Sequence, residues 1–124
     1  MKDRGELDAA MALLKEKEKI CRQLGDPAGL QASLGNQALI LQARGDLDGA
    51  MALHKEREKI CRQLGDPAGL ARSLANQALL LARVGRLTDA RSSATEALRL
   101  AQRHGLAALA RQIHTFLDSI QDGP

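Results

Sequence analysis

The chain has 124 residues, close to the usual size of one domain, so it can build one continuous hydrophobic core and is too short for a multidomain enzyme. Hydrophobic residues make up 44% of the chain but aromatic residues only 1%, which favours helices packed through Ala, Leu, Ile and Met over strands. No apolar run approaches the roughly 18 residues of a membrane span, and the start of the chain lacks the apolar segment of a secretory signal. We therefore expect one all-α domain in the cytoplasm, with no membrane as partner.

The formal net charge is +3, and it is spread thinly along the chain. Basic residues mostly follow acidic residues at helical spacing, as Arg22 follows Glu18 and Arg62 follows Glu58. This pattern is typical of a solvated helix surface. Because there is no basic stripe and no set of aromatic residues to stack on bases, we expect no nucleic-acid partner.

The sequence repeats itself with a period of about 40 residues. Residues 5–44 and 45–84 are identical at roughly 29 of 40 positions, and a diverged third copy begins at Gly85. Periods of this length indicate an array of stacked helical units. The near identity of the first two copies indicates either a recent duplication or deliberate construction.

The chain opens with a helix over residues 1–24, which we call a B helix. Its apolar positions recur at helical spacing: Leu7, Ala10, Met11, Leu14 and Cys21. Gly25 suits a left-handed helix end, and Asp26 followed by Pro27 suits the cap and first turn of the next helix.

That next helix, which we call an A helix, carries an apolar stripe of four residues: Leu30, Leu34, Ala38 and Leu41. Gly45 marks the following turn, and the same signals recur 40 residues later. The pattern predicts repeats over 26–64 and 66–104, and a terminal capping helix over 105–121. About six helices therefore alternate between the B and A types.

Both ends of this array are expected to be irregular. The first B helix has no preceding A helix, so one of its apolar sides should be uncovered. The last helix contains Phe116 and is expected to cap the array. We expect Ile113, Leu117 and Ile120 on its outer side.

The spacing of small and large residues resembles the tetratricopeptide repeat family. Leu34, Ala38, Leu41, Gly45 and Ala50 follow that family's series, as do their counterparts 40 residues later. The longer period and the phrases SLGNQAL and SLANQAL look most like its kinesin-light-chain-like branch. The resemblance covers nearly the whole chain and implies a right-handed α-solenoid of antiparallel helix pairs that binds protein partners.

The chain departs from the family at two kinds of position. Leu14, His54 and Ala94 stand where the family usually has Phe. Lys17 and Arg57 stand where a small residue is usual, which predicts that the first two B helices are longer and pack differently.

Few residues indicate chemistry. Cys21 and Cys61 occupy equivalent repeat positions and are expected to be small buried residues, not a disulfide or metal site. His54 replaces Leu14 of the first copy, and His104 is expected to end a helix. Because no nucleophile and base, carboxylate pair or phosphate loop is evident, we expect no enzyme activity, no cofactor and no metal.

The candidate binding residues lie on the A helices. By the resemblance, Asn36 and Asn76 point into a concave groove and bond to the ligand backbone, although an Asn bonded to a neighbouring helix is the alternative. Three arginines fall on or near the same face and favour a ligand with acidic groups: Arg72, Arg83 and Arg111. His114 is the one histidine expected to face the groove.

The leading interpretation is a protein-interaction module whose A-helix groove holds a peptide or protein partner. The first alternative is a structural unit that assembles into a homodimer or filament through its uncovered terminal helices. The second is an engineered repeat protein, or a fragment of a longer array, with no ligand of its own.

Overall fold

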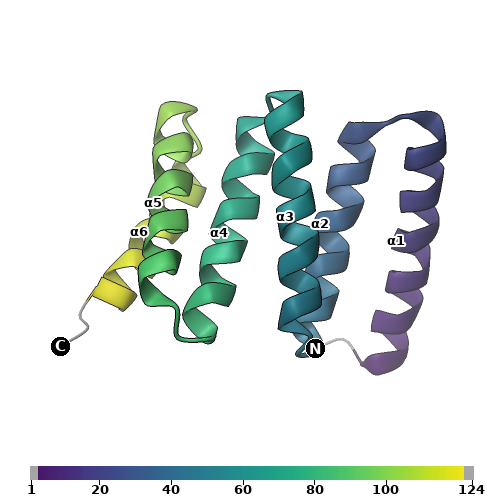
Figure 1. Ribbon diagram of the computed structural model, residues 1–124, viewed down its shortest axis with the longest axis horizontal. Coiled ribbons are helices and arrows are strands. Elements are labelled where there is room, and N and C mark those ends of the chain that lie inside the picture. Colours follow the sequence, from purple (N-terminus) through teal and green to yellow (C-terminus); the bar gives the residue numbers. More distant parts are fainter. Residues whose placement is uncertain (1–2, 122–124) are drawn as a thin grey trace. The chain divides into compact units, whose positions relative to one another are not determined.

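The computed structural model describes residues 3–121, and these residues form six α-helices and no strand (Figure 1). The helices are α1 (Arg4–Leu24), α2 (Pro27–Ala43), α3 (Leu47–Leu64), α4 (Pro67–Arg83), α5 (Leu87–Arg103) and α6 (Ala107–Gln121). Consecutive helices are antiparallel and joined by short turns, which is the arrangement of an all-α helical repeat. The predicted fold class is confirmed. α1, α3 and α5 are the B helices, and α2, α4 and α6 are the A helices.

Glycine turns end the helices where the sequence predicts. Gly25 and Gly65 both have φ of 66°, in the left-handed region that favours glycine. The Asp26 carboxylate then accepts a hydrogen bond from the backbone N–H of Gly29 at 3.0 Å, and Pro27 occupies the first turn. Asp66 caps α4 in the same way. The repeated phrase GDPAGL is therefore a helix stop followed by a helix start.

The chain divides into two compact units. Unit 1 comprises residues 1–60, which include α1, α2 and most of α3, and unit 2 comprises residues 61–124, which include the end of α3 and α4 to α6. The B helices shorten along the chain, from 21 residues in α1 and 18 in α3 to 17 in α5, as predicted.

The core of unit 1 mixes apolar and polar side chains. Leu34 and Ala38 of α2 are fully buried, and Met11 and Cys21 of α1 are also buried. Ser33 is also fully buried, and its hydroxyl donates to the backbone carbonyl of Leu14 at 2.7 Å. Such a buried hydroxyl is tolerated because it has a partner.

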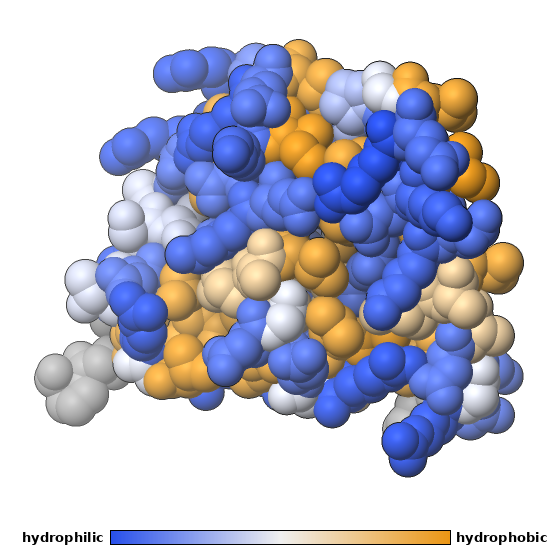
Figure 2. All heavy atoms as spheres, turned by 45° about the vertical axis from the view of Figure 1, so that its right-hand side comes forward, coloured by the Kyte–Doolittle hydropathy of each residue, from blue (hydrophilic) through white to orange (hydrophobic). Residues whose placement is uncertain are grey.

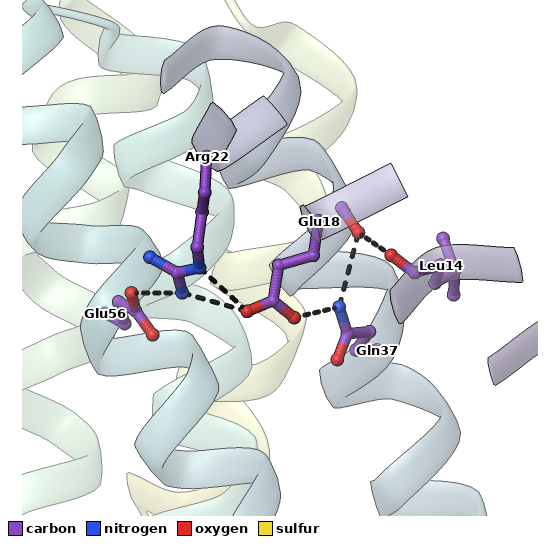
Figure 3. A network of polar contacts seen from close by, with 6 residues as sticks. Leu14, Glu18, Arg22, Gln37 and Glu56 are labelled. Atoms are coloured by element: carbon purple, nitrogen blue, oxygen red, sulfur yellow. Dashed lines mark hydrogen bonds and ion pairs between the residues drawn. The ribbon is translucent and has the colours of Figure 1, made fainter. Parts of the chain in front are cut away.

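A polar network continues from this point to the surface of unit 1 (Figure 3). The Gln37 side-chain amide donates to Glu18 at 2.9 Å, and Arg22 donates to both Glu18 and Glu56 at 2.9 Å. The amide of Gln37 lowers the pKa of the Glu18 carboxyl, and the two carboxylates raise the pKa of Arg22. The network links α1 to both α2 and α3.

The core of unit 2 is built mainly from alanine and leucine. Ala94, Ala97 and Ala101 of α5 are fully buried against Leu74 of α4 and Ile113 of α6. Ile113 is only 3% exposed, so the expectation that it lies on the outer side of α6 is wrong. α6 turns this residue toward α4 and α5 because Ile113 occupies the stripe position that Leu34 and Leu74 hold in the other A helices.

The surface carries both hydrophilic and hydrophobic side chains. In Figure 2, hydrophilic side chains cover much of the face shown, and hydrophobic side chains reach it in patches between them. None of the described helices has the length and apolar character needed to cross a membrane.

Candidate functional site

A hollow of about 340 Å³ in unit 2 is the best candidate for a binding site. It lies between the A helices α4 and α6, with α5 beneath. α6 packs mainly on α5 and contacts α4 at few positions, so the two A helices leave space between them. Ala94 of α5 forms part of the floor.

The walls of the hollow are apolar and its rim is polar. The apolar lining comprises Ala75, Leu79, Ala94, Leu109, Ile113 and Phe116. The polar lining comprises Arg72, Asn76 and Gln112. These three polar side chains make no hydrogen bond or ion pair with any residue from 3 to 121, so they can bond to a ligand.

The small side chain at position 94 explains part of the space. Ala94 occupies the repeat position of His54, whose larger ring is fully buried in unit 1 and lies 2.8 Å from the Gln42 amide oxygen. Burial and the nearby charge of Arg57 lower the pKa of His54 to about 4, so the ring is neutral near pH 7. It has the structural role expected from the sequence.

Two of the six predicted binding residues line the hollow. Arg72 and Asn76 lie one turn apart on α4, and both border it. Arg83 is exposed in the last turn of α4 and does not line it. Arg111 and His114 are exposed on α6 and do not line it either.

Asn36 is exposed on α2 in unit 1, at the position equivalent to Asn76. Neither asparagine makes a side-chain hydrogen bond to a described residue, so the alternative of an Asn bonded to a neighbouring helix does not describe this structure.

Sequence reasoning missed most of the apolar lining and Gln112. A signal for the hollow was present at position 94, where Ala replaces the usual Phe, because a missing ring leaves space beside it. The contribution of α6 had no such signal, since its third-copy sequence is diverged.

The cysteines and histidines form no second site. Cys21 and Cys61 are buried free thiols, as predicted, and each lies against the glycine that opens the next helix. His104 ends α5, also as predicted. Among residues 3–121, no three His, Cys, Asp or Glu side chains come together in a way that could hold a metal ion.

No protein-family model matches this sequence, and neither does any curated protein. The resemblance to tetratricopeptide repeats therefore remains a prediction, and the hollow of unit 2 is the feature that bears on function.

Proposed function

We propose that this chain is a protein-interaction module that binds an extended peptide segment of a partner, with one apolar side chain of the segment in the hollow of unit 2. The observation that carries the proposal is the combination of an apolar floor with three polar rim side chains that have no partner among the described residues. A volume of about 340 Å³ is at the low end for ligand sites, which suits one or two side chains.

The rim suggests what flanks that side chain. Asn76 and Gln112 each offer a donor and an acceptor, which suits the backbone N–H and C=O of an extended peptide. Arg72 offers a guanidinium that suits a carboxylate. The preferred segment would therefore carry a Leu, Ile or Met next to an Asp or Glu.

The test begins with a selection of random displayed peptides against the intact chain, followed by calorimetric titration with the best peptide. The substitution Asn76→Leu fills the mouth of the hollow and should weaken binding at least tenfold. Asn36→Leu makes the same substitution at the equivalent position of unit 1 and should leave binding unchanged. Equal binding by both variants, with helix content intact, would reject the hollow as the site.

A second pair of variants tests the acidic group. Arg72→Gln should weaken binding of a peptide with an acidic residue about threefold to tenfold and reduce its dependence on salt. Arg83→Gln removes an exposed arginine from the same helix outside the hollow and serves as the matched control. Equal effects would mean that only the net charge of the chain matters.

A further inference from the structure

A second depression lies on α5 in unit 2 and shares only that helix, and no residue, with the hollow. It has a volume of about 330 Å³, and the described residues that line it are Thr88, Arg91, Ser92, Thr95 and Arg99. Each of them is a hydroxyl or guanidinium residue, and none is a carboxylate. Their helical spacing places them on one side of α5. We call these five residues the α5 donor cluster.

The acidic residues of α5 do not neutralise this cluster. Asp89 and Glu96 each pair with an arginine outside the cluster. Arg91 and Arg99 form no ion pair with any residue from 3 to 121. The α5 donor cluster therefore presents two positive charges that have no counterion within the described part of the chain.

Some donors of the cluster are held in place by hydrogen bonds, and others are open to a ligand. Nη2 of Arg91 donates to the backbone carbonyl of Ile120 in α6 at 3.1 Å, which anchors the guanidinium and leaves its other N–H groups available. The Thr95 hydroxyl donates to the backbone carbonyl of Arg91 at 2.7 Å. Three side chains of the cluster make no hydrogen bond to a described residue: Thr88, Ser92 and Arg99. Two hydroxyls and two guanidiniums can therefore donate to a ligand.

A phosphate monoester suits these donors better than a carboxylate does. Arg91 and Arg99 are separated by about 12 Å along the helix axis, with Ser92 between them, so both long side chains can extend toward one group. A phosphate monoester has three terminal oxygens and nearly two negative charges near pH 7. A guanidinium can bond two of those oxygens at once, and a hydroxyl can bond the third. A carboxylate has only two oxygens and one charge.

The equivalent face of the other two B helices lacks this set of donors. Thr88 stands where both earlier copies have Asp, Arg91 where they have Met, and Ser92 where they have Ala. The third copy has thus lost a carboxylate from this face and gained a guanidinium and two hydroxyls. These differences increase the positive charge and the number of donors at one place.

The position of this face in the repeat keeps it accessible beside another helix pair. The counterparts of Thr88, Ser92, Thr95 and Arg99 on α1 are all exposed: Asp8, Ala12, Lys15 and Lys19. They are exposed although α3 lies beside α1, as the 2.9 Å pair between Arg22 and Glu56 shows. Met11, the counterpart of Arg91, is buried, but an arginine can keep its charged group at the surface by extending its aliphatic stem. The α5 donor cluster can therefore bind a ligand within a repeat array.

We propose that the α5 donor cluster binds a phosphate monoester, carried either by a phosphorylated side chain of a protein partner or by a free phosphorylated metabolite. Arg91 and Ser92 bind the phosphate from one end of the depression, and Arg99 binds it from the other. Thr88 adds a hydroxyl donor at the start of α5. This site is separate from the hollow and does not depend on the proposed function.

The first experiment titrates inorganic phosphate into the intact chain at constant ionic strength. The readouts are the NMR signals of the arginine Nε–H groups and of the backbone amides of α5. We expect saturable shifts for Arg91, Ser92 and Arg99, and much smaller shifts with acetate as the control anion. Absence of saturable shifts, or equal shifts with acetate, would overturn the proposal.

A pair of variants separates the site from the net charge of the chain. Thr88→Asp restores the carboxylate of the earlier copies and should weaken phosphate binding about tenfold. The helix should remain folded, because an aspartate in the first turn suits the helix dipole. Asn36→Asp makes the same change in net charge at an exposed position of unit 1 and should have little effect. Equal weakening by both variants would contradict a site on α5.

Arg91→Met copies the residue of both earlier repeats and should also weaken phosphate binding about tenfold. Arg86→Gln removes an exposed arginine of unit 2 outside the cluster and is the matched control. Asn76→Leu, which blocks the hollow, should leave phosphate binding unchanged. This last variant distinguishes failure of the phosphate site from failure of the proposed function.

The source of the phosphate is tested with two further probes, free phosphoserine and a short alanine peptide with a central phosphoserine. Tighter binding by the peptide would identify the ligand as a phosphorylated protein segment, because the flanking backbone then adds contacts. Equal binding by the two probes would identify it as a free phosphate ester. Failure of both probes to shift the signals of Arg91 and Arg99 would overturn the proposal.

Discussion

Units 1 and 2 place side chains of different sizes at the same contact between an A helix and a B helix. In unit 1 the glycine at position 35 leaves room for the Arg57 guanidinium, which bonds to Gln31. In unit 2 the equivalent residues are all alanines, Ala75, Ala97 and Ala71, and Ala97 and Ala71 are fully buried. A large polar side chain against a glycine and a small apolar side chain against an alanine occupy the same place in the repeat. The matched sizes of the pair, and not the identity of either residue, allow the helices to pack.

The same contrast holds at the B-helix position three residues earlier. Unit 1 places His54 in its interior, and unit 2 places Ala94 there. The histidine fills space and needs a polar partner, which Gln42 supplies. The alanine leaves space, which becomes the floor of the hollow. One copy of this repeat position is therefore structural, and the other forms part of a candidate site.

The largest expected effect comes from placing the arginine of unit 1 at the equivalent position of unit 2. Ala97→Arg should lower the free energy of unfolding by about 3 kcal/mol, because it buries a charge where Ala75 and Ala71 replace the glycine and the side-chain acceptor that Arg57 has in unit 1. Adding Ala75→Gly and Ala71→Gln, which complete the unit 1 arrangement, should restore about half of the loss. The measurement is urea unfolding followed by circular dichroism. If the triple variant is no more stable than Ala97→Arg, mismatched side-chain sizes are not the cause of the lost stability.

A second prediction tests the interior of unit 1 through pH. The pKa of His54 is lowered to about 4 from an ordinary 6.5, so between these values the unfolded chain binds a proton that the folded chain does not. Stability should therefore be full above about pH 6.5 and fall as the pH decreases toward 4, by roughly 3 kcal/mol from this residue.

His54→Leu, which copies the residue of the first repeat, should remove that part of the pH dependence. The lowered pKa of Glu18 acts in the same direction at lower pH, so the difference between the two chains isolates the histidine. The measurement is urea unfolding at a series of pH values. Identical pH profiles for the two chains would contradict the assignment.

The smallest expected effect concerns a feature that both units share. Arg22→Gln and Arg62→Gln each remove a 2.9 Å ion pair between consecutive B helices, and both arginine side chains are 46% exposed. Each substitution should cost less than about 1 kcal/mol, because solvent screens exposed pairs, and the cost should shrink at high salt. A larger loss in only one of the units would show that its pair belongs to a network that the other lacks.

The local signals in the sequence were sufficient to determine the six helices. Gly25 and Gly65 stop a helix, and Asp26 and Asp66 start the next one, through contacts within a few residues. The apolar stripe identified Leu34 and Ala38 as core, because helical spacing alone places such residues on one face. Helical spacing placed Arg72 on the groove side of the A helix, and the resemblance to tetratricopeptide repeats placed Asn76 there; both line the hollow.

Only the tertiary structure decided which of these residues share a site. Ile113 belongs to the core, and Arg83, Arg111 and His114 lie away from the hollow, because the rotation of α6 and the position of each turn depend on packing between helices. Likewise, Ile20 of α1 is 45% exposed, whereas Ile60, its counterpart on α3, is buried. Local spacing determines the face on which a residue lies, and the neighbouring helices determine whether that face becomes core, site or open surface.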